Sequence, residues 1–141
     1  MDIKETVYAA TFVDFPTVTA QQKGLSHGRF YTKPEVIRAK AWFYAHFMEE
    51  AKAVKELFPD IADDAFEVGI YYCYPTKTRK LWGKYKKTRP DVDNQTKLIL
   101  DVLTDTKLLW RDDSQVVQLH LCKRYEEVSK VTIIVNRIKE S

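Results

Sequence analysis

The chain has 141 residues, 45% of them hydrophobic, which is enough apolar material for one domain with a single core. Its formal net charge is only +3, its longest apolar runs fall far short of the roughly 20 residues that a membrane helix needs, and its first residues do not resemble a signal peptide. These features exclude a membrane-spanning protein, and we expect one of the cytoplasm, in which Cys73 and Cys122 stay reduced inside two strands.

The hydrophobic pattern predicts an α+β fold: a single small domain over residues 1–141, in which a mixed β-sheet is packed by one long helix and one shorter helix. Residues 7–15 and 29–31 have the alternation of strands. The run Thr32-Lys33-Pro34-Glu35 matches a capping box with proline in the first turn, and predicts a long helix that stops before Pro59. The apolar residues of this helix form two stripes, either of which could pack on the sheet or contact another subunit: Ile37, Ala41, Tyr44, Met48 and Ala51 in one, and Val36, Phe43, Phe47 and Val54 in the other.

Three more strands and a second helix follow. Residues 66–74 alternate as a strand, and residues 96–103 have the i, i+3, i+4 apolar spacing of a helix. Residues 115–125 and 128–137 are predicted to form a closing hairpin. Because His120 alternates with the apolar residues of its strand, we expect it to be structural or on the surface, with a role as general base as the weaker alternative.

Two acidic pairs flank the second helix. Asp91 and Asp93 are two residues apart, so in an extended segment both carboxylates leave the same face and can reach one cation. At about 4 Å two such groups repel by roughly 4 kcal/mol at an effective dielectric near 20, and a hard divalent cation removes this penalty. Asp112 and Asp113 lie where a helix-to-strand return could bring them to the same place. The alternative is that Asp93 caps the helix and that the second pair lies in a solvated turn.

Other metal and nucleophile motifs are missing from the sequence. An EF-hand counted from Asp91 would need a glycine at position 96 and an acid at position 102, where the chain has Thr96 and Val102. The cysteines and histidines show no zinc-ligand spacing. There is no glycine-rich phosphate loop and no nucleophile elbow. Magnesium or manganese is therefore the natural candidate for a cation at the acids.

A basic segment immediately precedes Asp91. Between Pro75 and Pro90 the chain has no acid and seven basic residues: Lys77, Arg79, Lys80, Lys84, Lys86, Lys87 and Arg89. Subtracting these seven charges leaves the rest of the chain at −4, so positive charge is concentrated here. The segment could hold a nucleic acid in front of the acids, or it could be a solvated loop. Trp82 and Tyr85 could stack on bases or anchor the loop.

The pattern Asp91-x-Asp93-Asn94-x-x-Lys97-x-x-x-Asp101-x-Leu103, followed by Asp112-Asp113-Ser114-Gln115-Val116, resembles the signature of the RusA family of Holliday-junction resolvases. The resemblance implies a magnesium-dependent homodimeric endodeoxyribonuclease that resolves four-way DNA junctions by paired symmetric nicks, in recombination, repair or prophage DNA processing. It assigns the metal to Asp91, Asp93 and Asp113, with Asp112 as a further candidate ligand. It also implies that Lys97 is the essential lysine and that Asp101 orients it.

These residue types suit that chemistry. A cation held by the three acids can polarise a phosphodiester oxygen and lower the pKa of an attacking water, which leaves a 5′-phosphate. Lys97 would neutralise the charge that gathers in the transition state, or position the water. Two alternatives stay open: a module that binds branched DNA or RNA without catalysis, and a nuclease that tolerates flaps or RNA.

Overall fold

The main sheet has four strands in the order β1-β6-β4-β5. The computed structural model describes residues 1–17, 23–26 and 29–140. In the sheet, β4 and β5 run parallel, and β6 runs antiparallel to both of its neighbours. The strands of this sheet are β1 (Ile3–Val13), β4 (Ala65–Pro75), β5 (Val116–Glu126) and β6 (Lys130–Lys139). Two short strands, β2 (Lys23–Ser26) and β3 (Arg29–Thr32), pair separately with each other.

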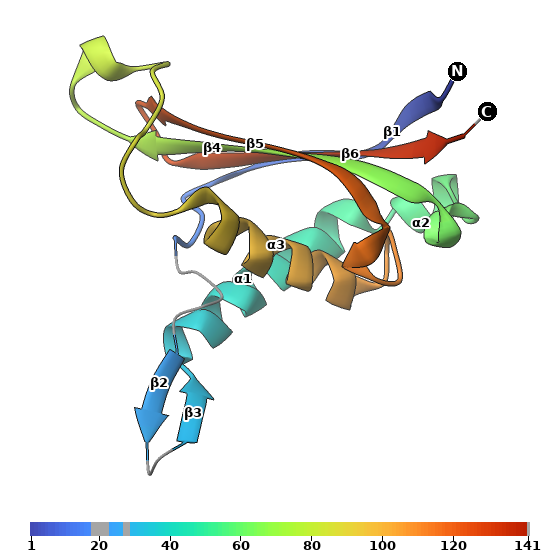
Figure 1. Cartoon of the computed structure of the whole chain (residues 1–141), viewed down its shortest axis with the longest axis horizontal. Helices are drawn as coiled ribbons and strands as arrows, with labels where there is room; N and C mark the ends of the chain where they lie inside the picture. Colours follow the sequence, from blue (N-terminus) through green and yellow to red (C-terminus); the bar gives the residue numbers. More distant parts are fainter. Residues whose placement is uncertain (18–22, 27–28, 141) are drawn as a thin grey trace.

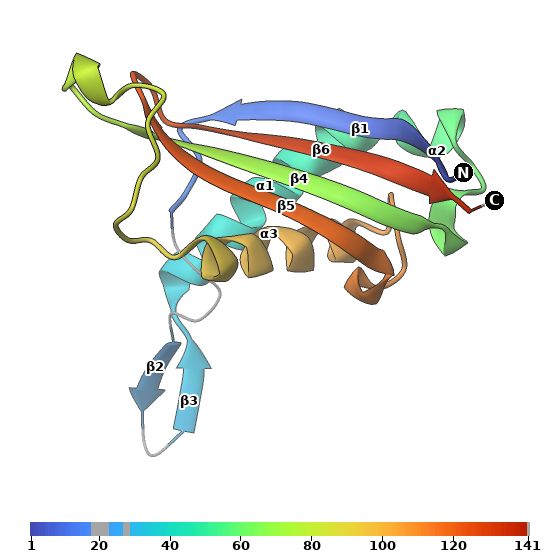
Figure 2. The same cartoon turned by 45° about the horizontal axis from the view of Figure 1, so that its top comes forward.

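Two helices, α1 (Pro34–Ala51) and α3 (Val92–Thr106), lie on the same face of the main sheet (Figures 1 and 2). A single turn, α2 (Val54–Leu57), and three short 3-10 segments complete the described elements: η1 (Ile61–Asp63), η2 (Arg79–Leu81) and η3 (Asp113–Gln115). The predicted α+β class is confirmed, with a mixed sheet, one long helix and one shorter helix that carries the acidic motif.

The core forms where the alternating side chains of the sheet meet the helices. In β4, every second residue from Phe66 to Tyr74 is buried, and the residues between them face the other side of the sheet. Phe43 and Phe47 of α1 and Leu98, Ile99 and Leu103 of α3 are fully buried against this face. The position of α3, and hence of its acidic residues, is therefore fixed by apolar packing.

The long helix differs from its prediction at both ends. It begins at Pro34, so the predicted proline in the first turn is present, and Lys33 at the N-cap position makes no side-chain capping hydrogen bond. The predicted capping box depends on the side chain of Thr32, which lies outside what the structure describes. It ends at Ala51, and α2 follows as a separate turn before Phe58. Of the two apolar stripes, the one that contains Phe43 and Phe47 is buried, whereas Ile37 and Tyr44 of the other are exposed.

The prediction of a hairpin between the last two strands is wrong. The strands themselves are present, but β4 lies between β5 and β6. Val131, Ile133 and Val135 of β6 are fully buried, which suits a central strand between β1 and β4. In contrast, residues 117–120 of β5 are all exposed, which suits the edge of the sheet.

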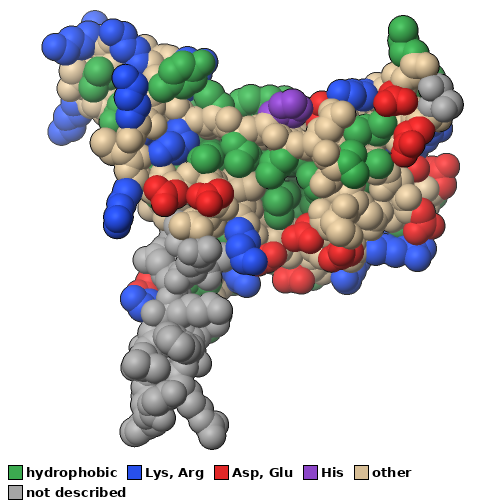
Figure 3. All heavy atoms as spheres, viewed as in Figure 1, with side chains coloured by type: hydrophobic (Ala, Val, Ile, Leu, Met, Phe, Trp, Pro, Cys, Tyr) green, Lys and Arg blue, Asp and Glu red, His purple; other side chains and the backbone are tan. Residues whose placement is uncertain are grey.

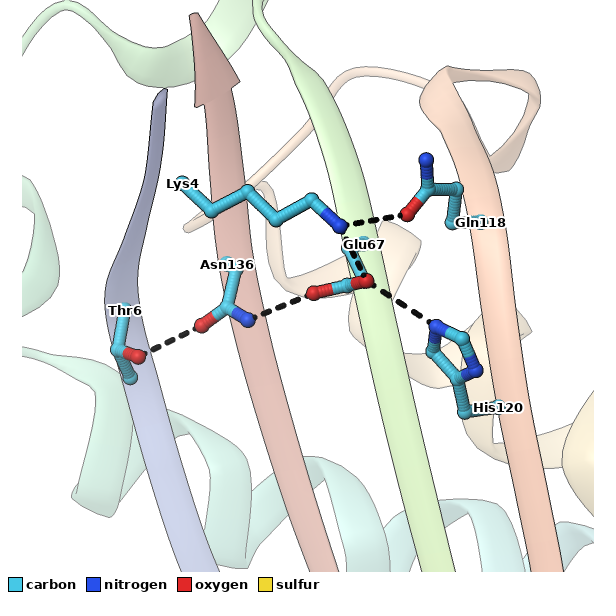
Figure 4. Close-up of polar contacts among 6 residues, drawn as sticks. All are labelled: Lys4, Thr6, Glu67, Gln118, His120 and Asn136. Carbon is cyan, nitrogen blue, oxygen red and sulfur yellow. Dashed lines mark hydrogen bonds and ion pairs between the residues drawn. The ribbon is translucent and has the colours of Figure 1, made fainter. Parts of the chain in front are cut away.

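The face of the sheet opposite the helices carries a polar network that crosses all four strands (Figure 4). The Glu67 carboxylate accepts hydrogen bonds from Lys4 at 2.9 Å and Asn136 at 2.9 Å, and His120 Nε2 lies 3.1 Å from it. Asn136 in turn accepts a hydrogen bond from Thr6 at 2.6 Å. These contacts, led by the Lys4 hydrogen bond, lower the pKa of Glu67 to about 2. His120 thus lies on the surface and contacts Glu67, as expected for the structural or surface role that the strand alternation predicted.

Candidate active site

Asp91 and Asp93 lie at the start of α3. Asp91 occupies the N-cap position in an extended conformation, but its side chain makes no capping hydrogen bond. Both residues are exposed, and within the part of the chain that the structure describes neither carboxylate takes part in a hydrogen bond or ion pair. The alternative that these acids serve as helix caps therefore has no supporting contact.

The first turn of α3 is held in place by two buried polar residues. The Tyr72 hydroxyl of β4 lies 2.7 Å from Thr96 Oγ1, and burial is the main cause of the raised pKa of that tyrosine. Gln95 Nε2 donates a hydrogen bond of 3.1 Å to the carbonyl oxygen of Pro16. The Oε1 atom of Gln95 is buried without a hydrogen-bond partner among the described residues, so Gln95 is only half satisfied. The buried Tyr72–Thr96 contact and the Gln95–Pro16 hydrogen bond tie the first turn of α3, from which the two acids project, to β4 and to the segment after β1. The sequence motif gave these two residues no role.

Lys97 and Asp101 continue the same face of α3, because they follow Asp93 by four and eight residues. Lys97 is exposed and Asp101 is half-buried. Among the described residues no ion pair joins Lys97 to either aspartate. The Lys97 ammonium is therefore available to an anion that approaches Asp91 and Asp93.

Asp112 and Asp113 lie beyond the other end of α3, where η3 leads into β5. Asp112 forms a reciprocal capping box with Gln115, and it also accepts a hydrogen bond of 2.5 Å from Ser114 Oγ. This hydroxyl contact is the main cause of the lowered pKa of Asp112. The Asp113 carboxylate makes no hydrogen bond or ion pair with any described residue, so of the two it is the one available to a cation.

Within one chain, the two acidic groups are not brought together. They stand at opposite ends of α3, whose 15 residues span about 22 Å. In the described ranges, 1–17, 23–26 and 29–140, no three histidine, cysteine, aspartate or glutamate side chains are placed to hold one metal ion. Among these residues, no third acidic side chain joins Asp91 and Asp93.

The basic segment forms a loop that folds back onto the end of β5. Gly83 N and Lys86 N donate hydrogen bonds to Tyr125 O and Lys123 O at 2.8 and 3.0 Å, and Lys123 Nζ donates to the carbonyl oxygens of Thr88 and Pro90, each at 2.7 Å. Figure 3 shows the basic side chains of this loop gathered beyond the sheet, with acidic side chains close to its base. The loop and the start of α3 thus form one continuous surface.

Six of the seven predicted DNA-binding residues are exposed: Lys77, Arg79, Lys80, Lys84, Lys87 and Arg89. Lys86 differs, because its ammonium lies over the rings of Tyr74 and Tyr125 and donates a hydrogen bond of 2.7 Å to Thr88. Trp82 is an anchor, since its indole N–H donates to Thr76 O at 2.9 Å. Tyr85, in contrast, is 61% exposed.

The family model described as endodeoxyribonuclease RusA matches residues 14–136. The chain belongs to the RusA family. The match includes both acidic pairs, Lys97 and the basic loop, so the resemblance drawn from the motif and the predicted enzyme class, an endodeoxyribonuclease, are confirmed.

Two relatives are similar to this RusA-family chain. The crossover junction endodeoxyribonuclease rusA of Lactococcus phage r1t is 26% identical over 133 residues, which cover 89% of this chain and 94% of the phage protein. The uncharacterized protein YqaN of Bacillus subtilis (strain 168) is 41% identical over 51 residues, which cover 36% of this chain and 34% of that protein. In addition, none of the described helices is both long and apolar enough to cross a membrane.

The residues at the start of α3 fit the divalent metal that the RusA family suggests. Asp91 and Asp93 supply hard oxygen donors, which magnesium and manganese prefer. Both carboxylates are exposed and free of competing contacts in the described structure. Magnesium in proteins is commonly bound by one or two carboxylates and keeps several of its water ligands. A third carboxylate would raise the affinity of the site.

Proposed function

We propose that this protein is a magnesium-dependent Holliday-junction resolvase of the cytoplasm, which cuts four-way DNA junctions by paired symmetric nicks in recombination, repair or prophage DNA processing. The observation that carries the proposal concerns Asp91 and Asp93, at the base of the basic loop. Neither carboxylate caps the helix or forms an ion pair with a described residue. The phage relative is named a crossover junction endodeoxyribonuclease, which supports the choice of substrate.

Asp91 and Asp93, together with an Asp113 carboxylate, would hold the metal in this proposal. When bound, the divalent cation supplies Lewis-acid activation of the phosphodiester and of a water nucleophile. Lys97, four residues beyond Asp93 on the same helix face, offsets the negative charge that develops on the phosphate oxygens. The basic loop binds the flanking phosphates and so orients the scissile bond.

We further propose that Asp113 reaches the site from a second copy of the chain. β5 is an edge strand, and its end is already paired with residues 83–86 of the basic loop. Its remaining free edge, residues 116–122, bears the exposed apolar side chains Val117 and Leu119, at 59% and 42% exposure. A free edge with exposed apolar residues is suited to pairing with an identical strand.

Antiparallel pairing of two such edges would place the beginning of each β5 beside the end of the other. The free edge spans about 20 Å at 3.3 Å per residue, which is close to the distance that separates the two acidic groups along α3. Asp113 of one copy would then approach Asp91 and Asp93 of the other. Between the edge and the start of α3 there is a depression of about 210 Å³ whose lining includes Val92, Leu121 and Lys123.

Cleavage of a synthetic four-way junction tests the proposed activity. We expect paired nicks with magnesium or manganese and none with a chelator, and we expect Asp93→Asn to bind the junction without cutting it, because the basic loop stays intact. Asp2→Asn, an exposed aspartate before β1 at the opposite edge of the sheet, is the matched control and should cut normally.

Two other results would redirect the proposal. Binding without cutting by the wild-type protein, in either metal, would favour a module that binds branched nucleic acid. The observation that favours this second candidate is that the described part of one chain contains no group of three acids placed to bind one metal ion. Equal cutting of junctions, flaps, duplexes and RNA would instead indicate a structure-tolerant nuclease.

A further inference from the structure

An open cavity lies against the basic loop, and the proposed metal site does not use it. Its volume is about 600 Å³, within the range of small-molecule pockets. It lies between the loop and the end of β5, and its lining includes Leu81, Lys84, Tyr85, Lys87 and Arg124. None of the described residues that line it is acidic. The cavity is therefore positively charged and partly aromatic.

The centre of this cavity is a stacked pair formed by Tyr85 and Arg124. The Arg124 guanidinium lies 4.2 Å from the centroid of the Tyr85 ring, and its two terminal nitrogens donate to Gly83 O at 2.6 Å and to the Tyr85 hydroxyl at 3.1 Å. Arg124 forms no ion pair with any described carboxylate. Since Tyr85 remains 61% exposed, the pair offers a flat surface to a ligand.

The loop backbone holds this surface in place before any ligand arrives. Tyr85 is paired with Arg124 as an antiparallel bridge, and Tyr125 N donates to Lys84 O at 2.9 Å. Gly83 has a positive φ of 81°, a conformation that glycine adopts without strain. A surface ordered in advance costs little conformational entropy on binding.

A flat aromatic-guanidinium surface beside free cations matches the chemistry of a nucleotide. Bases stack on tyrosine rings and on arginine planes, and phosphates pair with lysines such as Lys84 and Lys87 at the cavity. Thr88 also lines the cavity and is only three residues from Asp91. A base bound here would thus belong to a nucleotide near the cleaved bond.

We propose that this cavity binds an unstacked nucleobase from the branch point of the DNA substrate. This inference rests on the proposed function, because it assumes a branched DNA at Asp91. A base within a continuous duplex must be unstacked before it can enter, whereas a base at a branch point is already partly free. The cavity is then a determinant of specificity for branched DNA.

The test compares Tyr85→Ala with Tyr85→Phe by measuring junction affinity without metal. The junctions form a set in which each lacks one of the bases that flank the branch point. We expect Tyr85→Ala to bind the intact junction about tenfold more weakly, in line with the loss of one base stack, and Tyr85→Phe to bind like the wild type. On the one junction that lacks the base bound by the cavity, the wild type and Tyr85→Ala should bind equally well, because neither can form the stack.

Two results would overturn this inference: an unchanged affinity of Tyr85→Ala, or a loss of the same size on the intact junction and on every abasic junction. The second result would mean that Tyr85 only supports the loop. The same variants are also measured on a single-stranded oligonucleotide and its abasic forms. If the wild type shows no preference for a junction over a duplex, the proposed function fails, but the single-stranded comparison still decides whether the cavity binds a base.

Discussion

Removal of charge from the basic loop should change the salt dependence of DNA binding by a calculable amount. Each phosphate that a lysine or arginine neutralises contributes about −0.9 to the slope of log affinity against log salt. Six basic residues of the loop are exposed, whereas Lys86 is engaged with Tyr74, Tyr125 and Thr88. The wild-type slope should therefore be about −5 per loop, a loss of roughly 10³-fold between 50 and 200 mM salt.

The double variant Lys77→Gln/Lys80→Gln removes two of these exposed charges and should make the slope shallower by about 2. The assay is fluorescence anisotropy of a labelled junction in a salt series without metal. The matched control is Lys52→Gln/Lys55→Gln, which changes net charge equally at the far end of α1. If both variants change the slope equally, or if the loop variant leaves it unchanged, the assignment of DNA contacts to the loop is refuted.

Three other predictions concern stability and assembly. The pKa of Glu67 in the folded protein is about 2, below the ordinary 4.5. Its contribution to the free energy of unfolding is therefore complete above pH 4.5 and is lost as the pH falls toward 2. Glu67→Gln should thus lower the free energy of unfolding at pH 7 by about 1 to 2 kcal/mol, a value limited by solvent screening at the exposed partners of Glu67. Acid denaturation curves should show this difference from the wild type becoming smaller as the pH falls. Tyr72→Phe should cost about 1 kcal/mol or more by leaving buried Thr96 unpaired, and the pair Tyr72→Phe/Thr96→Val should recover most of this loss in urea unfolding. Leu119→Lys should dissociate the proposed dimer in sedimentation, whereas Ile37→Lys on the exposed side of α1 should not, and the reverse result would move the proposed interface to α1.

The elements and the acidic motif could be predicted because each depends on local patterns. The i, i+3, i+4 spacing within residues 96–103 reports burial of one helix face, and the alternation of residues 66–74 reports one buried face of a strand. The end of α1 at Ala51 carried no comparable signal, because neither glycine nor proline occurs between Pro34 and Pro59.

Strand neighbours and loop contacts could not be predicted in the same way, because they depend on tertiary packing. Only three residues, Glu127 to Ser129, join β5 to β6, a length typical of a hairpin, yet β4 lies between the two strands. Arg124 stacks on Tyr85, which lies 39 positions away in the sequence, and the periodicity of hydrophobic residues does not predict such a contact. The separation of Asp113 from Asp91 also follows from topology. α3 runs antiparallel to β5, so Asp91 before α3 and Asp113 before β5 lie at opposite ends of the helix.

Mixing two inactive variants tests whether each metal site is built from two subunits. In the proposed dimer, Asp93→Asn and Asp113→Asn each damage both sites of a homodimer. A heterodimer of the two retains one complete site, built from Asp91 and Asp93 of one subunit and Asp113 of the other. We expect the mixture, after subunit exchange, to nick one strand of a four-way junction, while each variant alone cuts nothing. A mixture as inactive as its components, beside an active wild type and with heterodimers shown to form, would contradict it.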